Sequence, residues 1–235
     1  MDEGRIAPGS PQRVPDPPRT VAEAFAHLLG KQRVIAHVGA RTNAPAGARR
    51  LGAVQSPPIS ALVEQLLTNS DNDIAEAMAR QVAISLKQPP SFDGGAAAVH
   101  DTLTRLGVAA GIDTVDGSGL SPRNQITPAA LARLLALTAS PAHPELRSVM
   151  SGMPIAGFSG TLATRFASGL AAAGKGLIRA KTGTLNGVNT LAGVVYDADG
   201  RLLAFAFMAN NVQSPVAALG SLDTLAGTLA SCGCR

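Results

Sequence analysis

The residues best suited to chemistry lie in two short motifs that are far apart in the chain. Lys181, Thr182 and Gly183 interrupt an apolar run, and a glycine beside β-branched threonines is typical of a strand whose backbone a ligand can approach. Ser70 and Asn72 lie upstream, between two helical patterns. Taken singly, Lys181 fits a solvated lysine at a strand edge, and Ser70 and Asn72 fit helix caps. Their joint presence indicates a functional site.

Ser-Asp-Asn followed by Lys-Thr-Gly resembles two of the three motifs of penicillin-recognising serine acyltransferases. The third motif, Ser-x-x-Lys, carries the serine nucleophile. The chain has four lysines, at positions 31, 87, 175 and 181, and none of them has a serine three residues before it. The residues that stand there are Leu28, Ile84, Ala172 and Ile178. These 235 residues therefore contain no nucleophile of that type.

The composition argues against several other classes of function. At 46% hydrophobic residues the chain can bury a globular core. There is no tryptophan and a single tyrosine, so aromatic platforms for nucleic-acid bases are lacking, and the net charge of +4 comes mostly from scattered arginines. No His-Glu-x-x-His, Gly-x-Ser-x-Gly or dinucleotide-binding motif is present. We expect no cofactor, no metal and no nucleic-acid partner.

The two ends of the chain differ from the rest in composition. Residues 1–19 hold five of the sixteen prolines, so we expect a disordered lead-in to a single domain over residues 20–235. The first residues lack the apolar core of a signal peptide. At the other end, Cys232 and Cys234 are too close-spaced for a relaxed disulfide within the chain and offer too few ligands for a metal.

A first helix is predicted to begin at Thr20, with Glu23 completing a capping box. Residues 34–36 are predicted as a short strand. The first helix presents an apolar face made of Val21, Phe25, Leu28 and Leu29.

The helices around the Ser-Asp-Asn motif are predicted to position it. One begins at Pro57-Pro58 and stops at Asn69, and a second begins at once with Asn72 or Asp73 as N-cap. Ser70 and Asn72 are therefore expected at a helix junction. Further helices are predicted over residues 96–107 and after Thr127-Pro128.

The last third of the chain predicts a sheet. Three apolar runs at 176–184, 188–197 and 201–210 are joined by two good hairpin sequences. Both faces of the third run are apolar, so helices should cover both sides of the sheet, one of them from Pro215 to Leu229. The expected fold class is α/β (α+β), with an antiparallel sheet covered by helices.

Ser-Asp-Asn, Asp-Gly-Ser-Gly-Leu-Ser at 116–121 and Ala-Lys-Thr-Gly-Thr-Leu at 180–185 follow one another in the chain. With these motifs the sequence resembles the D-alanyl-D-alanine carboxypeptidase/endopeptidase family of penicillin-binding proteins, peptidase family S13. The resemblance runs from about residue 20 to the C-terminus and covers the C-terminal half of a typical member. It implies a penicillin-binding, β-lactamase-like transpeptidase fold that is truncated at the N-terminus, without the helix that carries Ser-x-x-Lys.

The resemblance also implies a role for each motif residue. Ser70 would relay a proton toward the leaving amine, Asn72 would hold the substrate amide, and Lys181 would fix Ser70 and strengthen the positive field. The hydroxyls of Thr182 and Thr184 would meet the substrate carboxylate, and the Thr184 N–H would be one oxyanion donor. Gly183 would keep the strand open to substrate.

The implied partners are D-Ala-D-Ala peptides of peptidoglycan, β-lactams and the chain's own missing N-terminal half. The implied location is extracytoplasmic, in the cell envelope or secreted. Two functions remain open. In the first, the chain is the C-terminal part of a serine-type carboxypeptidase whose sequence is shortened by a late start codon, a frameshift or a split gene. Such a part would be inactive alone. Alternatively, it is a non-catalytic module that binds peptidoglycan peptides or β-lactams. The DNA upstream of Met1 would separate the two.

Overall fold

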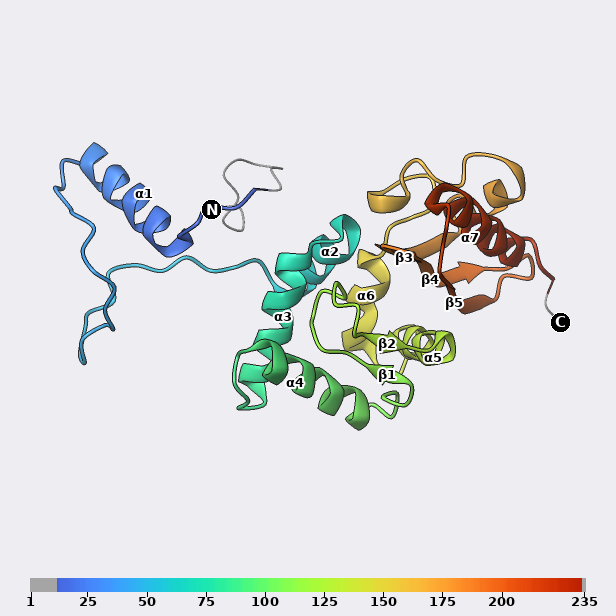
Figure 1. Ribbon diagram of the computed structural model, residues 1–235, viewed down its shortest axis with the longest axis horizontal. Coiled ribbons are helices and arrows are strands. Elements are labelled where there is room, and N and C mark those ends of the chain that lie inside the picture. Colours follow the sequence, from blue (N-terminus) through green and yellow to red (C-terminus); the bar gives the residue numbers. More distant parts are fainter. Residues whose placement is uncertain (1–11, 234–235) are drawn as a thin grey trace. The chain divides into compact units, whose positions relative to one another are not determined.

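The computed structural model describes residues 12–233, which fall into two compact units divided between Ser56 and Pro57 (Figure 1). The single domain expected over residues 20–235 stays a prediction. The family motifs all lie in the second unit, so the first is described briefly and by itself.

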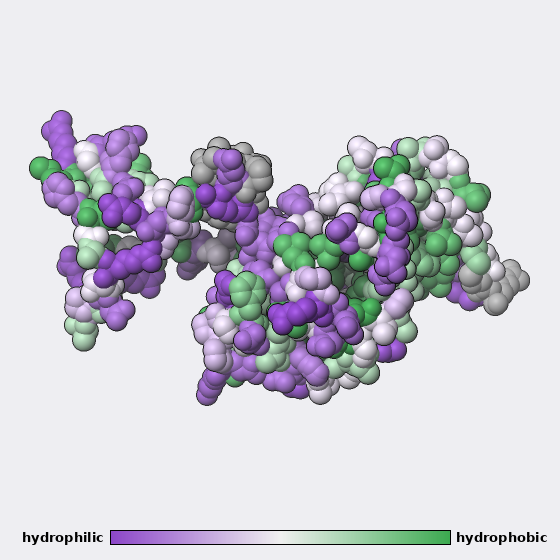
Figure 2. Space-filling model, in the orientation of Figure 1, coloured by the Kyte–Doolittle hydropathy of each residue, from purple (hydrophilic) through white to green (hydrophobic). Residues whose placement is uncertain are grey.

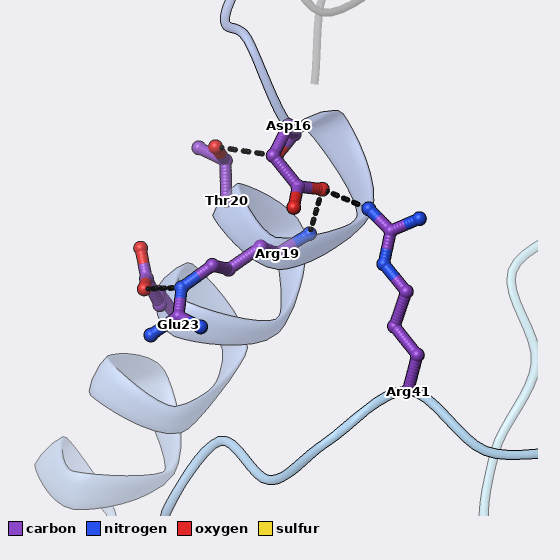
Figure 3. Close-up of polar contacts among 5 residues, drawn as sticks. All are labelled: Asp16, Arg19, Thr20, Glu23 and Arg41. Carbon is purple, nitrogen blue, oxygen red and sulfur yellow. Dashed lines mark hydrogen bonds and ion pairs between the residues drawn. The ribbon is translucent and has the colours of Figure 1, made fainter.

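The helix of the first unit, α1 (Pro17–Lys31), begins three residues before the predicted start. Asp16 is its N-cap, and the Asp16 carboxylate accepts a hydrogen bond from the Arg19 N–H at 3.1 Å and another from Arg41 (Figure 3). Asp16 caps in place of Thr20 because the two prolines after it suit the first helical turn. Glu23 pairs with Arg19 at 2.8 Å instead of completing a capping box.

The apolar face of α1 stays largely exposed. No residue of the helix is buried, and Val21, Phe25 and Leu28 each expose about half of their surface. The predicted strand at residues 34–36 is also absent, and Ile35 is exposed there. That prediction was wrong because a strand needs a hydrogen-bonding partner, and the described part of the unit supplies none.

The second unit contains helices, short 3-10 turns and two antiparallel sheets. The helices are α2 (Ile59–Asn69), α3 (Asn72–Ser85), α4 (Phe92–Arg105), α5 (Pro128–Thr138), α6 (Arg147–Gly152) and α7 (Pro215–Ala230). The 3-10 turns are η1 (Pro144–Leu146), η2 (Gly160–Leu162) and η3 (Gly169–Gly174). The strands are β1 (Ile112–Asp113), β2 (Gln125–Ile126), β3 (Ile178–Leu185), β4 (Val188–Tyr196) and β5 (Leu202–Asn210).

The larger sheet has the order β3-β4-β5 and is antiparallel throughout. Its strands and both hairpins match the sequence prediction to within two residues. One face packs on α7, where Leu191, Val195 and Phe205 of the sheet contact Leu222 and two alanines of the helix, Ala226 and Ala230. The other face packs on α5, where Ala192 and Val194 meet Leu135. Helices therefore cover both faces, and the predicted α/β class with an antiparallel sheet is confirmed.

Other details of the second unit differ from the prediction. Helix α4 begins at Phe92 because Ser91 caps it, and β1 and β2 were not predicted. Contrary to the spacing argument, Cys232 is disulfide-bonded; Cys234 lies outside the described residues. No helix within residues 12–233 is long and apolar enough to cross a membrane. Exposed large hydrophobic residues of the second unit are spread over several elements, among them Ile59, Leu170 and Val216, and Figure 2 shows several separate apolar patches on the face that it draws.

Candidate active site

Ser70 is the single residue between the end of α2 and the N-cap of α3. Its backbone is left-handed, with φ 55° and ψ 50°. This conformation costs a residue with a side chain about 1–2 kcal/mol, so the surrounding structure must hold it. The next residue, Asp71, begins α3 by accepting hydrogen bonds from the N–H groups of Asp73 and Ile74, both at 3.0 Å. Asp71 is therefore the N-cap that was expected at Asn72 or Asp73.

Lys181 approaches Ser70 from the sheet. It pairs with Ala192 of β4, so its side chain leaves β3 on the face that packs against α5. Its ammonium donates hydrogen bonds to Ser70 Oγ at 2.7 Å and to the Thr182 carbonyl at 2.8 Å. The junction of two helices and the central part of an edge strand thus bring together two residues that are 111 positions apart.

The surroundings of Lys181 favour its neutral form. Burial lowers the pKa of Lys181 from 10.5 to about 8, because an ammonium loses hydration energy when it leaves water. The two groups that accept hydrogen bonds from it are a hydroxyl and a carbonyl, neither of which carries a charge. A lysine with this pKa can give up and regain a proton near neutral pH.

The three residues after Lys181 continue the outer strand of the sheet. Thr182 pairs with Leu191 of β4, and its hydroxyl donates to Thr161 Oγ1 of η2 at 3.0 Å. Gly183 pairs with Thr190, and a Cβ added there would lie 2.3 Å from Thr190 Oγ1. A side chain at position 183 would therefore crowd the Thr190 hydroxyl of the neighbouring strand. Thr184 is exposed.

The free edge of β3 is covered over only part of its length. Residues 154–156 run beside its first half, with hydrogen bonds from Ala156 N–H to the Ile178 carbonyl and from Ala180 N–H to the Pro154 carbonyl, both at 3.0 Å. No described strand pairs with residues 182–185 on that side. Backbone donors and acceptors there are open to an extended ligand.

Asn72 follows Ser70 by two residues in the chain but makes no hydrogen bond to it in the described residues. It is the exposed first residue of α3. Within residues 12–233, no hydrogen bond joins its amide to Ser70 or Lys181. The structure thus joins Ser70, Lys181 and Thr182 through hydrogen bonds and leaves Asn72 beside them without a direct contact.

A mostly apolar hollow of about 240 Å³ adjoins Lys181 and Thr182. Residues of α2, α5, α6 and β4 complete its lining, among them Leu67, Leu131 and Thr190. A second hollow of about 520 Å³ lies beside α1 in the first unit and contains none of these residues. Of these two hollows, the smaller is therefore the one that adjoins the candidate catalytic residues Lys181 and Thr182.

Two threonines near the site were missed from the sequence. Thr190 could have been found from the strand register, since it stands opposite Gly183. Thr161 lies in the Gly-Thr-Leu-Ala-Thr-Arg-Phe stretch, whose fold could not be predicted. Nowhere in the described part of the chain do three His, Cys, Asp or Glu side chains gather as metal ligands would.

Known proteins share both the sequence and this arrangement. The model of the D-Ala-D-Ala carboxypeptidase 3 (S13) family matches residues 8–231. The carboxypeptidase Rv3627c of Mycobacterium tuberculosis is 38% identical over all of this chain and 50% of its own length. Penicillin-binding protein 4 of Haemophilus influenzae, solved with a β-lactam, gives a TM-score of 0.76 at 27% identity and covers 91% of this chain and 51% of that one.

A more distant structure supports the fold. The TLA-1 extended-spectrum β-lactamase gives a TM-score of 0.51 at 16% identity, covering 72% of this chain and 62% of its own. The sheet with helices on both faces is therefore of the penicillin-binding, β-lactamase-like kind. The chain spans about half the length of the curated relatives it matches. Its match to the family model over nearly all of its residues shows that the chain belongs to the D-Ala-D-Ala carboxypeptidase 3 (S13) family.

Proposed function

We propose that these 235 residues supply the proton relay and the substrate edge of a serine-type D-Ala-D-Ala carboxypeptidase or endopeptidase. Its substrates are the stem peptides of peptidoglycan, and its acyl-accepting serine lies on a segment outside these residues. The observation that carries the proposal is the 2.7 Å hydrogen bond from Lys181 to Ser70, at the point where β3 has an open edge.

Ser70 is suited to relay a proton because of the direction of that hydrogen bond. The Lys181 ammonium donates to Ser70 Oγ, so the proton of the hydroxyl itself remains available to another acceptor. When the external serine attacks the penultimate D-Ala carbonyl, its own hydroxyl proton passes to the lysine of its Ser-x-x-Lys motif. The C–N bond then breaks, the leaving amine takes the Ser70 proton, and Ser70 regains a proton from Lys181, whose pKa of about 8 makes this transfer accessible near neutral pH. Solvent reprotonates Lys181 and accepts the proton from the other lysine, so the protons balance. Water later hydrolyses the acyl-enzyme.

The open edge of β3 would hold the substrate. An extended peptide can hydrogen-bond to the backbone of residues 182–185 as an added strand. The Thr184 N–H would then be one oxyanion donor, and the hydroxyls of Thr182 and Thr184 would face the terminal carboxylate. Asn72, exposed at the start of α3, would hold the substrate amide. A β-lactam would occupy the same edge.

The hollow beside Lys181 would receive the segment that bears the nucleophile. Its lining is mostly apolar, and it adjoins both Lys181 and Thr182. A helix that packs an apolar face into this hollow would bring a serine to the end of β3. Because the substrate is a cell-wall peptide, the complete protein would act outside the cytoplasm.

The proposal is tested by labelling with a fluorescent penicillin. The 235-residue chain alone should not be labelled. The chain fused to the half of the Mycobacterium tuberculosis relative that it does not match should be labelled on a serine of that added half. Lys181→Ala should slow labelling of the fusion protein, whereas Lys175→Ala, at an exposed lysine near the same strand, should not.

A covalent adduct on Ser70 or on any other residue of the chain alone, located by mass spectrometry, would contradict the proposed division of roles. A folded fusion protein that binds the peptide and is never acylated would favour the non-catalytic binding module.

A further inference from the structure

Thr182 has a hydroxyl partner that is not part of either family motif. Thr161 belongs to η2, on the loop between α6 and β3, and is exposed. Its Oγ1 accepts the hydrogen bond from Thr182 Oγ1 at 3.0 Å. We propose that Thr161 is a residue of the carboxylate-binding site, where it orients the Thr182 hydroxyl so that the pair offers one fixed O–H to the ligand. This inference rests on the proposed function and extends it to a residue outside the motifs.

Counting donors shows what the pair of hydroxyls can offer. Each threonine hydroxyl has one proton, and one of the two protons is used in the bond between them. Either threonine can donate within the pair because hydroxyl hydrogens rotate, and one proton remains free in both arrangements. The pair therefore presents one O–H to an acceptor in front of it. Without Thr161, the Thr182 hydroxyl would be free to rotate and would present no fixed donor.

The charge of a carboxylate would be met by Lys181. Its ammonium donates to the carbonyl of Thr182 at 2.8 Å, and both residues line the same hollow. The ammonium is bonded to the backbone of the residue that carries one of the two hydroxyls, so it adds positive field at this part of the strand, and a hydrogen bond to a charged acceptor is stronger than one between neutral groups. A neutral carboxamide in the same place would gain much less from either group.

The loop that carries Thr161 is anchored to the segment before it, at Ile155, and packs closely on α2. The Ser159 Oγ accepts a hydrogen bond from the Ile155 N–H at 2.9 Å. Gly160 has φ of 54°, and a Cβ added there would lie 2.3 Å from the carbonyl oxygen of Thr68, close to the end of α2 that leads into Ser70. Only glycine fits that position without strain.

A further anchor joins the loop to α7. Arg165 donates two hydrogen bonds to the Asp223 carboxylate, at 2.6 and 3.1 Å, and the two side chains are only 14% and 11% exposed. Bidentate pairs of this kind fix geometry as well as charge. The anchors before and after Thr161 therefore hold its hydroxyl in place relative to both Ser70 and Thr182, as a ligand-contacting group requires.

The test compares two ligands on the full 235-residue chain, at protein concentrations low enough for the chain to sediment as a monomer. They are an N-acetylated peptide ending in D-Ala-D-Ala with a free carboxylate and the same peptide ending in a carboxamide. Dissociation constants are measured by NMR titration. Thr161→Val should weaken binding of the carboxylate peptide about tenfold, the scale of one hydrogen bond to a charged group, and should leave the carboxamide peptide unchanged. Thr161→Ser, which keeps the hydroxyl, should bind within about twofold of wild type.

Thr164→Val is the matched control, because Thr164 is an exposed threonine on the same loop and should have no effect. Equal binding of the carboxylate peptide by wild type and Thr161→Val would overturn the inference and leave the proposed function intact. An equal loss of affinity for both peptides in Thr161→Val would also overturn the inference, because it would indicate a general defect of the loop. If Thr161→Val perturbs the fold, the serine variant decides, since a tenfold loss there overturns the role of the hydroxyl. Failure of the wild-type chain to bind the carboxylate peptide would refute the proposed substrate edge, and the inference with it.

Discussion

The Lys181 ammonium lies 2.7 Å from Ser70 Oγ, and Ser70 is held in a left-handed conformation at the end of α2. The contact joins the helical part of the second unit to its sheet. A buried lysine with a hydroxyl and a carbonyl as its hydrogen-bond acceptors destabilises the fold while it is charged. A lysine at this position is explained by a use of its charge in catalysis.

Replacing Lys181 should slow acylation in the fusion protein described above. Lys181→Ala removes a preorganised cation next to the proton relay, and we expect a loss of roughly 10²-fold or more in the acylation rate. Lys181→Arg should restore only part of it, because the guanidinium is broader and spreads its charge. Stopped-flow or gel-based labelling with a fluorescent penicillin gives the rates. Equal rates for wild type and Lys181→Ala would mean that this lysine is structural.

The lowered pKa of Lys181 predicts a pH dependence of stability. Between pH 8 and 10.5 the folded state binds fewer protons at Lys181 than the unfolded state does, so the free energy of unfolding should rise with pH in this window. The difference between the two pKa values corresponds to a change of about 3 kcal/mol in the free energy of unfolding across this window. Lys181→Met should be more stable than wild type below pH 8, and the difference should shrink toward pH 10.5. Urea unfolding across this range measures it, and parallel curves for the two proteins would exclude the effect.

Local patterns were sufficient to predict the sheet and most of the helices. Strands β3, β4 and β5 alternate or run apolar between turn residues, and the prolines at 128 and 215 mark helix starts that the structure keeps. The start of α1 was missed because Asp16 and Thr20 can both cap a helix, and only the chain geometry decides between them. Strands β1 and β2 have two residues each, too few to show a period.

The site could be predicted only through motifs, because its contacts are between distant residues. Periodicity places Ser70 at a junction and Lys181 on a strand, but it does not place them within hydrogen-bonding distance of each other. The left-handed backbone of Ser70 and the contact between Thr161 and Thr182 depend on how α2, η2 and β3 pack together. No local pattern in the sequence records that packing.

The ion pair between Arg165 and Asp223 should contribute measurably to stability. Asp223→Ala would leave the guanidinium partly buried without its partner, and we expect a loss of roughly 3 kcal/mol in the free energy of unfolding. Glu145→Ala is the control, because its pair with His143 is exposed and such pairs contribute little. Urea denaturation of both variants at one pH provides the comparison. Equal midpoints for the two variants would show that the buried pair does not anchor the loop.

The last prediction concerns the outer edge of β5. This strand is at the end of the sheet, and its sequence, Leu-Leu-Ala-Phe-Ala-Phe-Met-Ala, is apolar on both faces. By family resemblance, strands from the half that this chain does not cover would pair along this edge. An uncovered apolar edge favours pairing between molecules.

The stability of the chain should suffer as well. Each large apolar residue left without its partners forfeits on the order of 2–3 kcal/mol of burial, whereas a whole domain is stable by only about 5–15 kcal/mol. We therefore expect the chain alone to bind dyes that detect exposed apolar surface and to associate as its concentration rises. Leu202→Lys, which places a charge at a residue that is 38% exposed on this strand, should reduce association, and the fusion protein should remain monomeric. Analytical ultracentrifugation measures both. If the wild-type chain sediments as a monomer and melts in one sharp transition, the edge of β5 needs no partner strand. The proposal that an added helix fills the hollow beside Lys181 would then have to be abandoned.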